Sequence, residues 1–199
     1  LYQALRRYDE ALDIYKQILV DPVFAKRKSL DWEKSLYAAL RISMMAQQDI
    51  GKSMQIVESA LSQENVPQFL QEDLREWRSD LLSWKTEKNV PSAGNSKGTN
   101  ALVNFAEKLM SRRITESSPR GKYVSVLRGA GILHNVLRIK SQDSPIEKAE
   151  IMWRLGHAYE DLSFTGVDSL HQFYFKTCVL TVPHTATAQR CFNDFEESL

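Results

Sequence analysis

The sequence lacks the short motifs that mark common catalytic and nucleotide-binding sites. It contains no HExxH zinc motif, no GxSxG nucleophile turn, no phosphate-binding P-loop and no paired CxxC motifs. No apolar run approaches the roughly 18 residues of a membrane span. The 199 residues carry a formal net charge of only +1, which predicts no bulk attraction to nucleic acid or to a membrane. We therefore expect no catalytic residues, no cofactor, no metal site and no membrane span in this chain.

Cysteine is also scarce, with two residues in the whole chain. Cys178 and Cys191 lie on either side of a turn at Pro183, and an antiparallel helical hairpin would bring them together. A disulfide between them would indicate an oxidising compartment. The alternative is a pair of reduced cysteines buried in a helical core. The sequence alone leaves both interpretations open.

The remaining composition is ordinary for a globular chain, with 43% apolar and 26% charged residues. A chain of this length buries about 70% of its unfolded surface and needs no metal to fold. Apolar residues recur at intervals of three and four, which is the period of a helix. The sequence therefore predicts an all-α protein. The expected helices span residues 1–20, 32–47, 52–61, a stretch opened by Pro67, 101–114, 118–139, 146–163, a stretch capped by Asp168, and 186–199.

One stretch interrupts the helical pattern. Residues 89–100 read NVPSAGNSKGTN and contain proline, two glycines and two serines, with no large apolar residue beyond Val90. Such a composition is typical of a linker or loop. We expect it to divide the chain into an N-terminal helical part at 1–88 and a C-terminal helical part at 101–199.

The helix before this linker carries a narrow apolar stripe. Steps of four, three, four and three separate Leu70, Leu74, Trp77, Leu81 and Trp84. Two tryptophans one heptad apart supply a large apolar surface. The stripe predicts packing on the preceding helices, and the competing hypothesis is a ridge that docks a partner helix.

Two glycines interrupt the predicted helix at 118–139. Glycine costs about 1 kcal/mol in a helix interior, so Gly129 and Gly131 call for a reason. We expect a neighbouring helix to approach closely there. The pair is not a dinucleotide-binding fingerprint, because no strand precedes it and no third glycine follows.

Two segments resemble the tetratricopeptide repeat (TPR) family. In the first, Ala11, Tyr15, Ile18 and Pro22 match the second helix of such a repeat, with Ile18 in place of the usual small residue. In the second, the Leu-Gly-x-x-Tyr pattern of 155–159 matches a first helix. The resemblance implies a right-handed superhelix of antiparallel helix pairs, with a concave face made mainly by first helices. It also implies a protein or peptide partner.

The helix at 146–163 carries the candidate binding residues. If its Leu-Gly-x-x-Tyr positions face inward, a tryptophan, an arginine, a histidine and acidic residues occupy the remaining sides. Tryptophan and arginine are enriched where binding energy concentrates. We expect partner contacts from Glu150, Trp153, Arg154, His157, Glu160 and Asp161. The competing hypothesis for Trp153 is simple packing on the helix that starts at Ser118.

The sequence thus predicts a non-enzymatic scaffold that binds a partner protein or peptide in a helical-repeat groove. No nucleic acid partner is expected, because the basic stretch at 100–140 lacks interleaved exposed aromatics. The alternative is a helical-repeat domain of a larger enzyme or envelope assembly factor, with chemistry or a metal near His157 and His171. The closing motif at 178–199 is similar to repeat proteins of the bacterial envelope. That likeness favours a periplasmic or exported location over a cytoplasmic one.

Overall fold

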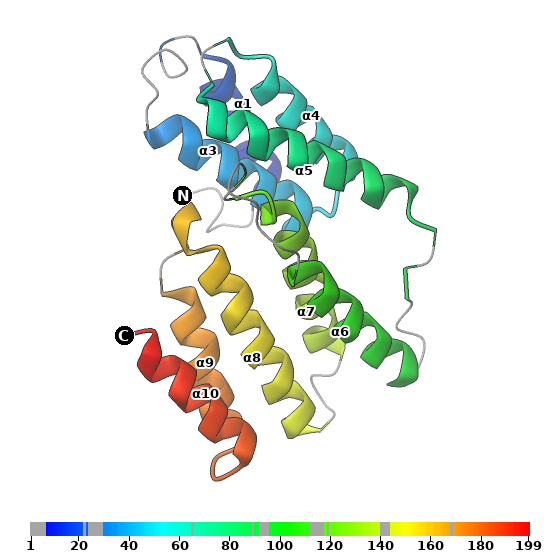
Figure 1. Cartoon of the computed structure of the whole chain (residues 1–199), viewed down its shortest axis with the longest axis vertical. Coiled ribbons are helices and arrows are strands. Elements are labelled where there is room, and N and C mark those ends of the chain that lie inside the picture. The colour runs from blue at the N-terminus through cyan, green and yellow to red at the C-terminus, as the bar shows by residue number, and fades with distance from the viewer. Residues whose placement is uncertain are drawn as a thin grey trace. The chain divides into compact units, whose positions relative to one another are not determined.

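The computed structural model describes residues 7–21, 23, 30–64, 66–88, 90–91, 96–111, 118, 120–139, 144–167 and 169–199. Within this part of the chain every regular element is a helix, as predicted (Figure 1). In chain order these are α1 Tyr8–Val20, α3 Leu30–Arg41, the π-helix η1 Ile42–Ala46, α4 Ile50–Leu61, α5 Gln68–Thr86, α6 Ser96–Met110, α7 Tyr123–Ile139, α8 Pro145–Asp161, the 3₁₀ turn η2 Ser163–Thr165, α9 Leu170–Thr181 and α10 Ala186–Glu197. Over the described residues, no helix combines the length and the apolar character that crossing a membrane requires.

The chain forms two compact units. Unit 1 comprises residues 1–88 and 112–127, and unit 2 comprises residues 89–111 and 128–199. The first residues of α7 therefore belong to unit 1 and the rest to unit 2. Residue 89 and residues 92–95 of the predicted linker lie outside the described residues, and α6 begins at Ser96 instead of Ala101.

Unit 1 is built on α5. Its predicted stripe is buried, since Leu70, Leu74, Trp77 and Leu81 are at most 1% exposed, whereas Trp84 is half-buried. The indole of Trp77 packs against the Tyr37 ring of α3 at a centroid distance of 6.0 Å, and its Nε1 donates to the carbonyl of Arg120 at 2.8 Å. The part of the stripe from Leu70 to Leu81 therefore lies in the core of unit 1.

A buried carboxylate on α5 explains why the chain after residue 118 differs from the prediction. We expected Ser118 to cap a helix, but α7 begins at Tyr123. The Ser118 hydroxyl donates instead to Oδ1 of Asp73 at 2.7 Å, and the Arg120 amide donates to the same oxygen at 3.1 Å. Asp73 is fully buried, so these two donors replace the water that it loses on folding.

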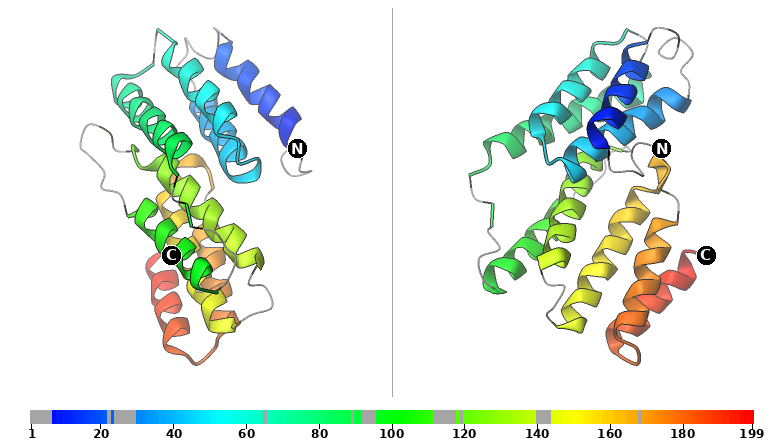
Figure 2. Two further views of the ribbon diagram at one scale, coloured as in Figure 1. Left: turned by 90° about the vertical axis from the view of Figure 1, so that its right-hand side faces the viewer. Right: turned by 180° about the vertical axis from the view of Figure 1, so that it is seen from behind.

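The helix boundaries around α4 follow local capping chemistry. Asp49, predicted to lie in a turn, is the N-cap of α4, and its carboxylate accepts from the Lys52 amide at 2.9 Å. Because the preceding helix is predicted to begin at residue 32, the sequence favours Asp31 as its N-cap. This prediction is wrong, because α3 already begins at Leu30 and places Asp31 in its first turn. In the first view of Figure 2, the helices of unit 1 lie side by side.

In unit 2, α8, α9 and α10 pack in antiparallel succession (Figure 2). Two helices of unit 2 approach closely at Gly156, where an added Cβ would meet ring atoms of Phe175 at 2.2 Å. Gly129 likewise lies against Met110 of α6, with Cγ at 2.6 Å from an added Cβ. Gly131 has nothing within 4 Å of that position, so the close-approach prediction is wrong there.

Two phenylalanines of unit 2 are exposed. Phe173 of α9 is 58% exposed and Phe192 of α10 is 41% exposed. Successive residues turn by about 100° around a helix, so only one side of each helix can face its neighbours. Phe175 takes the inward position on α9, and Cys191 takes it on α10.

Cys178 and Cys191 form a disulfide, which confirms the first of the two interpretations of their spacing. The Cα atoms lie 6.2 Å apart, within the range that a disulfide spans without backbone movement. The turn between α9 and α10 ends at Thr185, which is the N-cap of α10. Its side chain accepts from the Ala188 amide at 3.1 Å.

Candidate functional site

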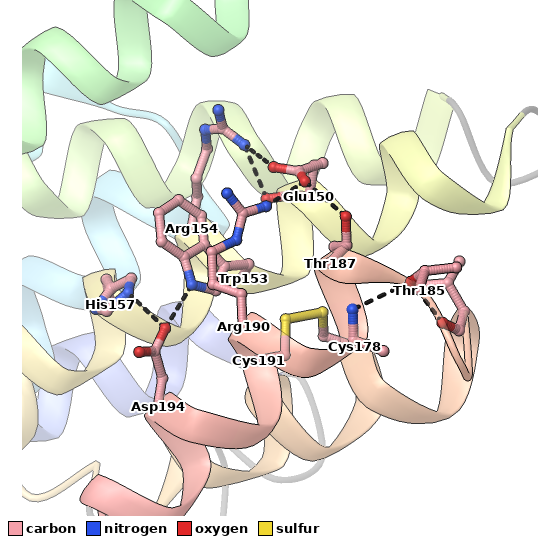
Figure 3. A network of polar contacts seen from close by, with 12 residues as sticks. Glu150, Trp153, Arg154, His157, Cys178, Thr185, Thr187, Arg190, Cys191 and Asp194 are labelled. Carbon is pink, nitrogen blue, oxygen red and sulfur yellow. Dashed lines mark hydrogen bonds and ion pairs between the residues drawn. A yellow bond between two sulfur atoms is a disulfide. The ribbon is translucent and has the colours of Figure 1, made fainter.

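Four of the six predicted site residues lie in one polar network on α8, and α10 supplies their partners (Figure 3). Figure 3 shows Glu150, Trp153, Arg154 and His157 beside the side chains of α10. Glu160 joins the network only through His157. Asp161, at the end of α8, is half-buried. The α10 contributors, which we did not predict, are Thr187, Arg190 and Asp194.

Glu150 is the hub of the network. Its Oε1 accepts from the Thr187 hydroxyl at 2.9 Å and from the Arg190 guanidinium, and its Oε2 accepts from Nη1 of Arg154 at 3.1 Å. Burial alone would raise the pKa of Glu150. The Thr187 hydrogen bond and the two guanidinium groups outweigh burial and hold the pKa below its ordinary value. Glu150 is therefore an ionised carboxylate whose two oxygens are both engaged.

Trp153 lies half-buried between α8 and α10. Its Nε1 donates to Oδ2 of Asp194 at 2.5 Å. The guanidinium of Arg190 lies over the indole at 4.4 Å from the ring centroid, and that of Arg154 lies at 5.6 Å. The ring also packs on the cluster around the disulfide. Trp153 is thus neither fully buried nor freely exposed.

His157 extends the network by one turn of α8. Its Nε2 lies 3.2 Å from Oδ2 of Asp194, and its Nδ1 lies 3.2 Å from Oε2 of Glu160. The edge of the imidazole contacts Trp153, with 4.9 Å between ring centroids. His171 stands apart on α9, where its Nδ1 is buried without a hydrogen bond.

The charges continue across a third helix. Nε of Arg154 lies 3.6 Å from a carboxylate oxygen of Glu107 on α6. A charge ladder of alternating sign therefore runs from Glu107 through Arg154 and Glu150 to Arg190, joining α6, α8 and α10.

A surface depression of about 210 Å³ lies beside the ladder, between α6 and α8. Half-exposed apolar side chains and polar groups both contribute to its walls. It is lined by Asn100, Val103, Asn104, Ile146, Glu147, Glu150, Ile151 and Arg154.

Glu150 and Asp194 each accept hydrogen bonds from at least two side chains of the network. Among the described residues, no three His, Cys, Asp or Glu side chains converge in a way that could hold a metal ion. What the network does offer is an ordered tryptophan with charged neighbours at a surface.

The α10 half of the network had a sequence signal. Thr187, Arg190 and Asp194 are spaced by three and four residues, so they share one face of a helix. A polar stripe of this kind is more often solvated surface. Only the position of α10 against α8 turns it into a partner for Glu150 and Trp153.

Comparison of the chain with protein-family models, with curated proteins and with solved structures gave no match. The TPR resemblance therefore rests on the sequence positions alone, and the fold stands as an all-helical arrangement of neighbouring helices.

Proposed function

We propose that this chain is a non-enzymatic scaffold that binds a protein or peptide partner on the face shared by α6, α8 and α10. The proposal takes these three as first helices of TPR-like pairs that form the concave side of a right-handed superhelix. Support comes from the order of contacts, since the charge ladder joins α6 to α8 and α8 to α10.

One observation carries the proposal: Trp153 is held in a fixed orientation at this face, with Arg190 over its ring. Binding energy at protein interfaces concentrates in tryptophan, tyrosine and arginine side chains that a partner removes from water. Because the Asp194 hydrogen bond already orders the indole, a partner would lose little conformational entropy in covering it.

The disulfide supports a second part of the proposal, a periplasmic or exported location. Disulfides persist in oxidising compartments and are rare in reducing ones. The Cys178–Cys191 bond is compatible with such a location.

Site-specific photocrosslinking tests the binding face. A photoreactive phenylalanine analogue at Ile146, 53% exposed beside α6, should capture a partner. The same analogue at Leu180, 70% exposed on α9, is the matched control and should capture less.

A pull-down with the intact chain and with Trp153→Ala and Arg154→Ala gives the energetic test. We expect both variants to lose the partner while keeping the helical circular dichroism of the parent. A partner retained equally by all three chains would place the binding site elsewhere.

A further inference from the structure

We propose that the Cys178–Cys191 disulfide is a redox switch for α10: its reduction releases α10 from α8 and dismantles the network around Trp153. The consequence for partner binding rests on the proposed function. The release of α10 does not, because it follows from how that helix is attached.

α10 has little apolar surface to hold it in place. All of its residues are described, and the side chains that it buries are those of Thr187, Ala188 and Cys191. Phe192 is exposed and Phe195 is half-buried. Apolar burial scales with the area removed from water, so an alanine and a cysteine stabilise the docked helix only modestly.

Apart from the hydrogen bond that buried Thr187 donates to Glu150, the remaining attachments of α10 are polar contacts near solvent. Arg190 and Asp194 reach α8 with side chains that are 44% and 23% exposed. Gln172 of α9 donates to the carbonyl of Ser198 at 2.8 Å. Exposed ion pairs contribute little to stability, since water competes for both partners. The covalent bond is therefore the strongest single link between α10 and the rest of unit 2.

The disulfide and the network share the same short stretch of helix. Arg190 directly precedes Cys191, and Asp194 follows one turn later. If α10 moves away, Trp153 loses its hydrogen-bond acceptor and the cation over its ring, and Glu150 loses the donors from α10. Opening the disulfide thus changes the surface that the proposed partner would meet.

The pair formed by α8 and α9 does not depend on the disulfide. Phe175 packs against Gly156, and the rings of Tyr159 and Tyr174 stack at a centroid distance of 5.3 Å. Leu155 and Phe175 are fully buried. We therefore expect reduction to release α10 locally, with α8 and α9 still folded.

The chemical step is thiol–disulfide exchange with a dithiol reductant. One thiolate of the reductant attacks a cysteine sulfur and forms a mixed disulfide, and the other cysteine leaves as a thiolate that takes up a proton. The second thiol of the reductant then attacks the mixed disulfide. Two electrons pass to the protein, which gains two thiols, and the reductant becomes a disulfide. Because both cysteines are 0% exposed, the attack requires a prior opening of α10.

Hydrogen–deuterium exchange with peptide-level mass spectrometry tests the switch on the whole chain. Three samples are compared: the oxidised protein, the protein reduced with dithiothreitol, and the Cys178→Ala/Cys191→Ala variant. A tether that closes a loop of this length predicts about a 100-fold loss of protection across residues 188–199 in the second and third samples. Peptides of α8 and α9 should keep their protection.

Glu150→Gln is the matched control, since it weakens the polar contacts of α10 and leaves the disulfide closed. Its α10 protection should fall by less than about tenfold. Equal α10 protection in oxidised and reduced protein would overturn the switch. Loss of protection in α8 and α9 would also overturn the switch, because the disulfide would then stabilise unit 2 as a whole.

Partner capture by the Ile146 crosslinker, measured with and without dithiothreitol, separates this inference from the proposed function. Released α10 with altered capture supports both. Released α10 with unchanged capture upholds the release of α10 and shows that binding near Ile146 does not need the docked helix.

Discussion

Gly156 lies so close to Phe175 that a methyl group on its Cα would come within 2.2 Å of the phenyl ring. The ring is fully buried. We expect Gly156→Ala to destabilise unit 2 by about 1–3 kcal/mol, because overpacking forces side chains from their preferred rotamers. Urea denaturation followed by circular dichroism measures the loss.

Gly131 supplies the matched control in another helix of the same unit. A Cβ there meets nothing within 4 Å, so Gly131→Ala should be neutral or should stabilise α7 by up to about 1 kcal/mol. Equal destabilisation by both substitutions would show that the Phe175 contact is not the cause.

Glu150→Gln should weaken α10 docking in a pH-dependent way. The pKa of Glu150 is lower in the folded chain than its ordinary 4.5, so its ionised form stabilises the folded state. That stabilisation is complete above pH 4.5 and is lost as the pH falls through the lowered pKa. At pH 7 we expect the variant to lose about 1 kcal/mol of docking free energy for α10, and the loss should narrow toward pH 3. Hydrogen exchange of α10 at pH 7, and unfolding curves at both pH values, measure it.

Glu160→Gln controls for a general effect of removing charge from α8. Glu160 has a side chain that is 55% exposed and contacts His157 on its own helix. Its substitution should leave α10 protection close to that of the parent. A pH profile in the Glu150 variant that parallels the parent would contradict the role assigned to Glu150.

Two substitutions of Asp73 should change the free energy of unfolding by different amounts. Asp73→Ala removes the acceptor of the Ser118 hydroxyl and the Arg120 amide, and an unpaired buried donor costs about 1–3 kcal/mol. Asp73→Asn keeps one oxygen for both donors, and it replaces an oxygen that has no hydrogen-bond partner. We expect it to change the free energy of unfolding by less than about 1 kcal/mol.

The same pair carries a pH signature. Burial raises the pKa of Asp73 above 3.8, against the lowering effect of Ser118 and Arg120. The folded chain therefore binds this proton more tightly than the unfolded chain. The parent should lose stability as the pH rises from 3.8 through the raised pKa, and the asparagine variant should lack that loss. Thermal unfolding between pH 3 and 7 would refute the assignment if the two profiles were parallel.

His134 of α7 makes unit 2 sensitive to mild acid. Burial lowers its pKa below 6.5, and its Nε2 lies 2.8 Å from the Tyr159 hydroxyl. Below pH 6.5 His134 binds a proton in the unfolded chain but not yet in the folded chain. The free energy of unfolding therefore falls as the pH drops toward the lowered pKa. His134→Gln, which can still bond Tyr159, should flatten this dependence. Urea unfolding at pH 7.5 and 5.5 gives the change in the free energy of unfolding with pH for the parent and for the variant. An equal change in both chains would contradict the role assigned to His134.

Local patterns predicted much of the fold. The stripe from Leu70 to Leu81 is buried, and Thr185 caps α10, because each depends on residues within a few positions of one another. The sequence also offered the disulfide as one of two alternatives, because Pro183 marks the turn between the two helices that carry Cys178 and Cys191.

Contacts between residues far apart in the sequence could not be predicted from local patterns. An aspartate beside an apolar stripe is typically solvated, and the partner of Asp73, Ser118, is 45 residues away. The polar face of α10 looked like surface, although Glu150 and Trp153 lie against it. In both cases the residue type was ordinary and only the packing of distant helices gave it a partner.

The division of the chain has a consequence for the order in which it can fold during synthesis. Trp77 donates to the carbonyl of Arg120, 43 residues later, and Tyr123 packs on the same indole. Between them the chain passes through α6, which belongs to unit 2. Unit 1 therefore cannot complete its core as the ribosome releases residue 88. The aromatic residues around Trp77 stay partly exposed until part of unit 2 has also left the ribosome.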